Sequence, residues 1–119
     1  MTDKSDYEIL FYVKAGGECP VDDFLDLLPL KVLGKVNKWL QLLEKNGPDL
    51  PRPYADTVRD KIRELRLIFN SNQYRFLYFF SGDKIVLTHG FIKKSQKVPE
   101  DEIERAIRFM KDYQERSET

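Results

Sequence analysis

The sequence predicts a single α+β domain, residues 1–119, in which helices pack against a mostly antiparallel β-sheet. A chain of 119 residues is long enough for one compact domain and too short for two ordinary ones. Its hydrophobic share of 41% is sufficient for a core. Segments of strand and helix character follow one another in the order β-α-α-β-β-β-α, with tight turns between the last strands.

The first strand is expected at residues 7–13, which are rich in aromatic and β-branched side chains. Gly16-Gly17 ends this segment. A short helix is expected to begin at Pro20, because proline suits a first helical position, and Pro29 interrupts it. The chain is therefore expected to pass from the strand into one short helix.

A longer helix is expected over residues 30–45, where apolar side chains, Trp39 among them, recur at helical spacing. Asn46-Gly47-Pro48 is a stop signal for this helix. Residues 47–58 contain three prolines and are expected to form a connecting loop without regular structure.

The second half of the chain is expected to form a meander of strands followed by a helix. The three strands are expected at residues 59–69, 73–81 and 84–92. Asn70-Ser71-Asn72 and Ser81-Gly82-Asp83 separate them and suit tight turns. From Pro99 onward, apolar residues on one face and acidic residues in the first turn predict a final amphipathic helix.

The first hairpin of this meander can be given a register from the sequence. If Phe69 pairs with Asn72, one face carries the cross-strand pairs Leu67–Tyr74, Leu65–Phe76 and Arg63–Tyr78. The same register places Arg66 directly opposite Arg75 on the other face. Facing like charges destabilise a sheet, so a functional gain is expected, and two adjacent guanidinium groups suit a phosphate or a carboxylate. An alternative interpretation pairs Arg66 with Glu64 and leaves Arg75 in solvent.

The charges of the chain are segregated, although the formal net charge is zero. Residues 1–58 carry 7 Lys+Arg and 10 Asp+Glu, residues 59–97 carry 9 and 3, and residues 98–119 carry 4 and 7. The middle segment therefore predicts a cationic surface that attracts phosphates, and a plain solvated basic patch is the alternative.

Lysines at the end of the last strand are expected to add to this surface. Lys93, Lys94 and Lys97 follow a strand that adjoins the arginine hairpin in an antiparallel sheet. Lys61 and Arg63 lie at the start of the strand that carries Arg66. Lys61, Arg63 and Lys97 are candidates for substrate binding, and for Lys61 and Arg63 solvation of the sheet edge is the alternative.

His89 is the single histidine of the chain. It has the same parity as Ile85, Leu87 and Phe91, which predicts that it shares their face of the sheet. Its two interpretations are a catalytic group and a hydrogen-bonded, partly buried structural residue.

Several other classes of chemistry are disfavoured. The glycines match neither phosphate-binding loop pattern, and no serine has the glycine context of a hydrolase nucleophile. One cysteine, Cys19, and one histidine offer neither an internal disulfide nor a set of zinc ligands, and no metal or cofactor is expected. Without a long apolar run or the layout of a signal peptide, the chain is expected to be cytoplasmic. What remains is chemistry by cations on RNA or another phosphodiester.

Four segments of the second half carry motifs in a fixed order. They are Ile62-Arg63-Glu64-Leu65-Arg66, Gln73-Tyr74-Arg75-Phe76-Leu77-Tyr78, Leu87-Thr88-His89-Gly90-Phe91-Ile92-Lys93-Lys94-Ser95-Gln96-Lys97-Val98-Pro99 and Glu102-Ile103-Glu104-Arg105-Ala106. Together they resemble the RelE/ParE superfamily of toxins, and most of all its phage-derived, HigB-like branch. The similarity covers roughly residues 47–113, and this family's fold implies the same order of strands and helices.

The resemblance implies a toxin that cuts messenger RNA without a metal, usually in the ribosomal A site. The ribose 2′-OH attacks the adjacent phosphate, and cations stabilise the charge of the transition state. By position, Arg75 matches the arginine after the hairpin that RelE and HigB toxins use at the scissile phosphate, and Arg66 matches a second hairpin arginine in HigB-like toxins. Lys93 and Lys94 match a basic pair near the end of the final strand, and all four cations are expected to bind and stabilise the phosphate.

One departure from the family concerns proton transfer. RelE has a catalytic tyrosine in its last helix, and Ile103 stands at the corresponding position here. The general acid or base is therefore expected to be His89, a lysine of lowered pKa or a ribosomal group. Val98 before Pro99 replaces a frequent helix-capping threonine, which concerns stability more than function.

The resemblance also implies partners. A cognate antitoxin is expected, of the helix-turn-helix, HigA-like kind, together with messenger RNA and the ribosome as targets. Operator DNA is expected to be reached only through the complex with the antitoxin. ParE members of the superfamily are not nucleases and bind DNA gyrase, so a gyrase inhibitor, or an inactive relative that only binds its antitoxin, is the alternative.

Overall fold

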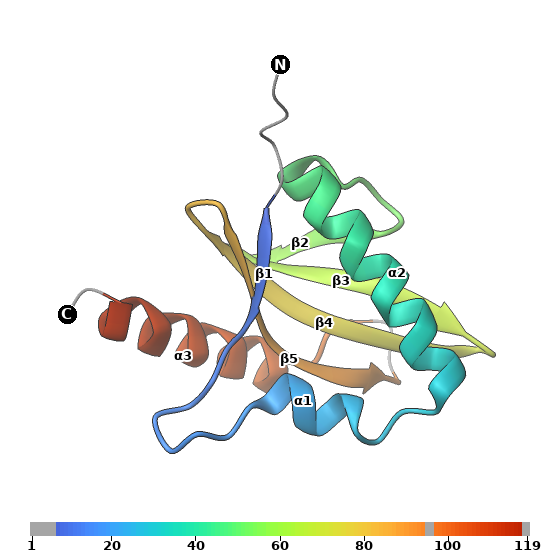
Figure 1. Cartoon of the computed structure of the whole chain (residues 1–119), viewed down its shortest axis with the longest axis horizontal. Helices are drawn as coiled ribbons and strands as arrows, with labels where there is room; N and C mark the ends of the chain where they lie inside the picture. Colours follow the sequence, from blue (N-terminus) through green and yellow to red (C-terminus); the bar gives the residue numbers. More distant parts are fainter. Residues whose placement is uncertain (1–6, 95–96, 118–119) are drawn as a thin grey trace.

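The computed structural model describes residues 7–94 and 97–117, which form one five-stranded sheet with three α-helices (Figure 1). The elements, in chain order, are β1 (Glu8–Phe11), α1 (Pro20–Leu25), α2 (Leu30–Asn46), the 3-10 helix η1 (Gly47–Asp49), β2 (Ala55–Arg59), β3 (Ile62–Phe69), β4 (Asn72–Ser81), β5 (Lys84–Lys93) and α3 (Glu100–Ser117). The strand order is β1-β5-β4-β3-β2, with β1 parallel to β5 and the other neighbours antiparallel. The predicted α+β class with a mostly antiparallel sheet is confirmed.

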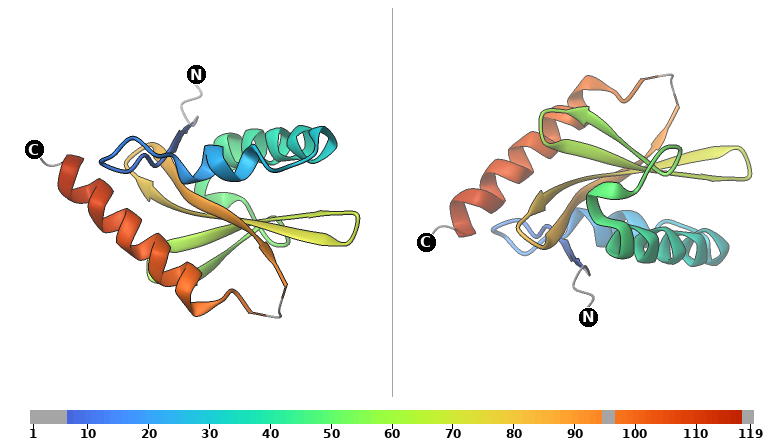
Figure 2. Two further views of the ribbon diagram at one scale, coloured as in Figure 1. Left: turned by 90° about the horizontal axis from the view of Figure 1, so that it is seen from below. Right: turned by 90° about the horizontal axis from the view of Figure 1, so that it is seen from above.

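The sheet separates two layers of helices, with α1 and α2 on one face and α3 on the other (Figure 2). Apolar residues of β3, β4 and β5 such as Leu65, Phe76 and Leu87 fill the core under α1 and α2. Leu77 and Phe79 belong to a second core, which α3 completes. No helix among the described residues is long and apolar enough to cross a membrane.

The hairpin between β3 and β4 has the register that the sequence predicts. Its cross-strand pairs are Phe69–Asn72, Leu67–Tyr74, Arg66–Arg75, Leu65–Phe76 and Arg63–Tyr78. The two turn residues, Asn70 and Ser71, both have positive φ, at 51° and 71°. A two-residue turn of this kind matches the twist of the flanking strands and fixes their register.

The end of α2 follows the local signal at Gly47. This residue has a φ of 53°, in the left-handed region that glycine adopts without strain. A Cβ atom at this position would also overlap the Tyr7 ring, which packs on the turn from the segment before β1. Gly47 therefore ends the helix and leaves space for the Tyr7 ring just before β1.

The prediction of a structureless loop over residues 47–58 is wrong at both of its ends. The structure has η1 at its start and the strand β2 at its end, and β2 pairs with β3 through Ala55–Leu65 and Asp56–Glu64. The sequence does not predict β2 because it is a short edge strand with polar residues and an irregularity between Thr57 and Arg59. The strand predicted over residues 59–69 accordingly begins at Ile62 and not at residue 59.

The prediction that His89 shares a face with Ile85, Leu87 and Phe91 holds for Phe91 and is wrong for Ile85 and Leu87. The register between β4 and β5 shifts by one residue, from Leu77–His89 to Tyr78–Leu87, so Thr88 is the extra residue of a β-bulge. The Thr88 hydroxyl donates to the Leu77 carbonyl oxygen at 3.1 Å and holds the bulge. Leu87 therefore faces α1 and α2, whereas His89 faces α3.

Candidate active site

The predicted cations gather on the face of the sheet that also carries α3. Arg66 on β3 and Arg75 on β4 face each other, and Lys93 on β5 pairs with Gln73, two residues before Arg75. Alternation along the strands places all three cations on one face. The β3–β4 hairpin extends beyond the helix that covers the rest of this face (Figure 2).

A buried carboxylate lies between the two facing arginines. Glu64 Oε2 is 3.0 Å from Arg66 Nε, and Glu64 Oε1 is 3.0 Å from Arg75 Nε. Glu64 and Arg75 are each only 4% exposed. The like-charge pair that the register creates is therefore neutralised in part by an acid on the same face.

The contact between Glu64 and Arg75 is an ion pair rather than a hydrogen bond. Both Arg75 Nε and Glu64 Oε1 are buried, and their alignment does not satisfy either atom. The other nitrogens of Arg75 donate to the Tyr74 carbonyl oxygen at 3.2 Å and to Gln73 Oε1 at 2.8 Å. Burial is the main cause that lowers the pKa of Arg75, and the charge of Arg66 adds to it while Glu64 opposes it. Imperfectly satisfied buried charges of this kind are typical of functional sites.

Arg66 forms the outer part of this cluster. Its side chain is 31% exposed, and its Nη2 lies 3.3 Å from Asp56 Oδ2 on β2. Arg52 contacts the same Asp56 oxygen at 3.1 Å. Ion pairs thus continue from Arg52 to Arg75 through two carboxylates. The alternative interpretation is right that Arg66 pairs with Glu64 and wrong that Arg75 stands in solvent.

Lys93 is the third cation of the cluster. Its side chain is half-buried, and burial is the main cause that lowers the pKa of its ammonium group, followed by the charge of Arg75. Lys94, the next residue, is exposed just beyond the strand. Lys97 is also exposed, beyond residues 95–96, which lie outside the described residues.

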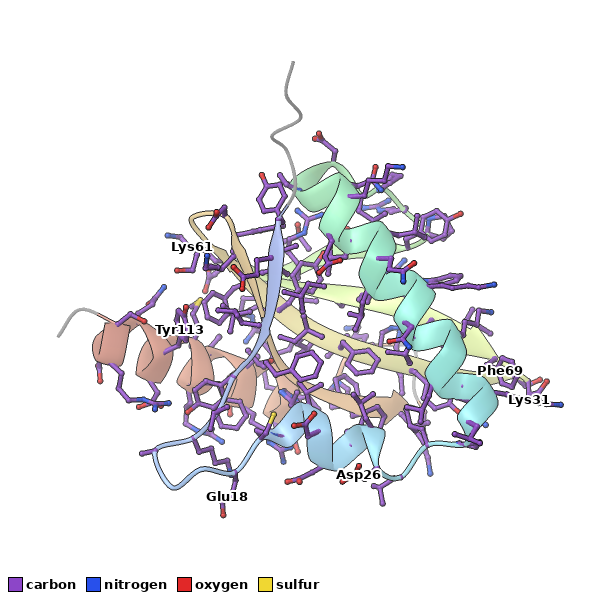
Figure 3. All side chains as sticks on the ribbon, in the orientation of Figure 1. Glu18, Asp26, Lys31, Lys61, Phe69 and Tyr113 are labelled. Carbon is purple, nitrogen blue, oxygen red and sulfur yellow. The ribbon has the colours of Figure 1, made fainter. Side chains whose placement is uncertain are left out.

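The structure does not bring Lys61 and Arg63 into this cluster. Arg63 pairs with Tyr78 and therefore faces the opposite side of the sheet from Arg66. Lys61 lies in the turn just before β3, and Figure 3 shows it at the opposite end of this strand from Phe69. Their role in substrate binding stays a prediction.

His89 lies under α3 and is 1% exposed. Its Nε2 is 2.9 Å from Glu102 Oε1, and its Nδ1 is 3.2 Å from the Thr88 hydroxyl. Its ring stacks on Phe91. Burial lowers the pKa of His89, and the Glu102 carboxylate acts in the opposite direction. These contacts favour the structural interpretation of His89 over the catalytic one.

Three residues of the site were not predicted as site residues. The sequence indicates Glu64 only as a partner of Arg66, although its parity places it on the arginine face. Asp56 belongs to β2, for which the sequence predicts a loop. Gln73 shows no signal in the sequence beyond its place two residues before Arg75. Among the described residues, no three His, Cys, Asp or Glu side chains are grouped to hold a metal ion.

The architecture and the family comparison indicate the same kind of protein. The architecture is compatible with a RelE-like α+β domain, and its sheet presents two arginines and a lysine around a buried acid. The family model "Phage derived protein Gp49-like (DUF891)" matches residues 23–111, and the chain belongs to this Gp49-like family. The family is one of RelE/HigB-like toxins, which confirms the predicted resemblance at this level, while the HigB branch stays a prediction. No curated protein sequence matches the chain.

Proposed function

We propose that the chain is the toxin of a type II toxin–antitoxin pair and a metal-independent endoribonuclease that cuts messenger RNA on the ribosome. The family supports the role of toxin. The single observation that supports a nuclease is the cluster of Arg66, Arg75 and Lys93 around buried Glu64. A protein that only binds gyrase has no need of such a phosphate site.

In the proposed reaction the ribose 2′-oxygen bonds to the adjacent phosphorus, and the bond from phosphorus to the 5′-oxygen breaks. Arg66 and Arg75 stabilise the additional negative charge on the phosphate oxygens. Lys93 donates a proton to the departing 5′-oxygen, a role that its lowered pKa favours. The 2′-OH proton passes to a base that the ribosome supplies, because the remaining candidate, His89, is buried under α3.

Access to Arg75 depends on Gln73. The Gln73 amide oxygen accepts from Arg75 Nη2, and Gln73 itself is exposed. A phosphate oxygen, which is charged, forms a stronger hydrogen bond with a guanidinium group than an amide oxygen does. The substrate is therefore proposed to displace the Gln73 side chain and to meet Arg66 first, since that side chain is the more exposed.

The proposed biological setting follows the same family. The toxin is cytoplasmic, is held inactive by a helix-turn-helix, HigA-like antitoxin, and reaches operator DNA only in that complex. These statements rest on the RelE/HigB-like family and on the HigB-like motifs of residues 87–99.

A cell-free translation reaction with a defined message tests the proposal. We expect cuts inside the translated region, mapped by primer extension, and no cuts when initiation on that message is blocked. Arg66→Lys keeps the charge but loses the planar fork that bridges Glu64 and Asp56, so cleavage should fall by about a hundredfold or more. Arg59→Lys makes the same change at a surface pair with Glu100 and should cleave normally.

The gyrase alternative makes the opposite prediction. Intact messages in the translation reaction, together with DNA breaks in cells that express the chain, would overturn the proposal. Intact messages without DNA breaks would indicate an inactive relative that only binds its antitoxin.

A further inference from the structure

A small cavity opens at the edge of β3, beside the arginine cluster. The pairing between β2 and β3 reaches only to Ala55–Leu65. Beyond this pair, side chains of α2 cover the strand edge: Trp39 Nε1 donates to the Arg66 carbonyl oxygen at 2.7 Å, and Lys35 Nζ donates to that of Ile68 at 2.6 Å. The space left between these side chains and the turn before β2 measures about 240 Å³. We call it the edge pocket.

Two aromatic rings form the inner wall of the edge pocket. Trp39 and Tyr54 line it, with ring centroids 5.6 Å apart and planes at 61°. Both residues are only partly buried. The hydrogen bond from the indole nitrogen to Arg66 fixes the orientation of the Trp39 ring. Ile68, which is 55% exposed, forms an apolar rim.

Three cations border the same pocket. Arg66 and Arg75 line it from the sheet, so it is continuous with the proposed phosphate site. Lys35 Nζ lies 5.1 Å from the centroid of the Trp39 ring. Aromatic rings beside arginines and lysines are the combination with which proteins hold single-stranded nucleic acids, because a base stacks while its phosphate is neutralised.

We propose that the edge pocket binds a nucleobase of the RNA, next to the phosphate held by Arg66 and Arg75. Its volume is below the range of about 300–1,000 Å³ that drug-sized ligands occupy, which suits one planar base. The identity of the ligand as RNA rests on the proposed function, whereas the pocket itself rests on the contacts above. The pocket gives Trp39, Tyr54 and Lys35 a role in positioning the message.

The single tryptophan of the chain makes the proposal directly measurable. Because Trp39 is the sole source of tryptophan fluorescence, its emission reports on this pocket. We expect saturable quenching when the purified protein is titrated with AMP or UMP at millimolar concentration. Ribose 5-phosphate, which carries the phosphate without a base, should leave the emission unchanged.

A matched pair of variants locates the binding. Ile68→Glu places a carboxylate on the rim and should weaken nucleotide binding on the order of tenfold. Ile92→Glu makes the same change at an exposed isoleucine of β5 that does not line the pocket, and binding should be unaffected. Equal loss in both variants would overturn the assignment to this pocket.

The outcomes separate this inference from the proposed function. Quenching by nucleotides in a protein that cuts no message would support the pocket and reject the nuclease. Normal cleavage without quenching, and with an Ile68→Glu variant of unchanged rate, would reject the pocket alone. Quenching by an acidic antitoxin segment but not by nucleotides would assign the pocket to a protein partner and reject the inference.

Discussion

Replacing Glu64 by glutamine should destabilise the protein strongly, because one buried carboxylate pairs with both facing arginines. Glutamine keeps the volume of the side chain, so no cavity forms. Its amide oxygen can accept from only one guanidinium group, and its amide nitrogen then faces the other as a second donor. The perturbation is therefore electrostatic and is confined to the cluster.

The magnitude follows from the unequal burial of the two arginines. Arg66 is 31% exposed and keeps its contact with Asp56, so water can compensate part of its loss. Arg75 is 4% exposed, so water cannot compensate for the loss of its carboxylate partner. Removing one partner of a buried ion pair costs about 3–5 kcal/mol of unfolding free energy. For a domain of this size that corresponds to a fall in Tm of about 10–20 °C.

Thermal and urea unfolding measure this loss, and Asp56→Asn is the matched control. Asp56 stands opposite Glu64 on β2 and also pairs with Arg66, but its side chain is 25% exposed, so the same chemical change there should cost less than about 1 kcal/mol. A double-mutant cycle with Arg75→Met should recover much of the lost stability, since it removes the unpaired charge. Equal stability of the Glu64→Gln and Asp56→Asn variants would refute the reasoning.

Three further predictions concern proton transfer, pH and the backbone. Lys93→Ala should reduce message cleavage about a hundredfold, whereas Lys84→Ala, at a surface ion pair with Glu8, should not; wild-type cleavage should fall as pH rises through the lowered pKa of Lys93, measured as a pH–rate profile. Since burial lowers the pKa of His89 below its ordinary value of 6.5, the unfolded chain binds the proton first; stability should fall as pH decreases below about 6.5, and His89→Asn should flatten that slope in urea unfolding. Gly47→Ala should lower Tm through its positive φ and the overlap with Tyr7, whereas Gly34→Ala, in open space on α2, should raise it slightly.

The sequence is sufficient to predict the two facing arginines of the candidate site and not the acids that pair with them. Arg66 and Arg75 could be placed opposite each other because a two-residue turn and an alternating apolar face fix one register. The repulsion that this register implies is visible in the sequence, but the acid that relieves it is recognised only when burial is known. The place of Asp56 in the site could not be predicted, because β2 is a short polar edge strand that follows three prolines.

The layer in which His89 lies illustrates a different limit. By sequence spacing His89 should face the same way as Ile85 and Leu87, but a bulge places Leu87 and His89 on opposite faces of the sheet. Thr88 is a residue type that is common in ordinary strands, so nothing in the sequence marks the bulge. The pattern of apolar residues therefore continues through the bulge without a break, and only the paired strand reveals it.

Strand β5 thus consists of two segments in opposite phase that meet at Thr88. In the segment before it, Ile85 and Leu87 face the core under α1 and α2 while Val86 faces the core under α3; the segment after it carries Lys93 to the arginine face. Loss of residue 88 would leave an uninterrupted strand in which His89 to Lys93 keep their faces, whereas loss of a residue between His89 and Lys93 would turn Lys93 away from the arginines. Among related proteins, β5 can therefore lose the bulge residue at position 88 without disturbing the site. We expect natural differences in the length of β5 to be concentrated at this position.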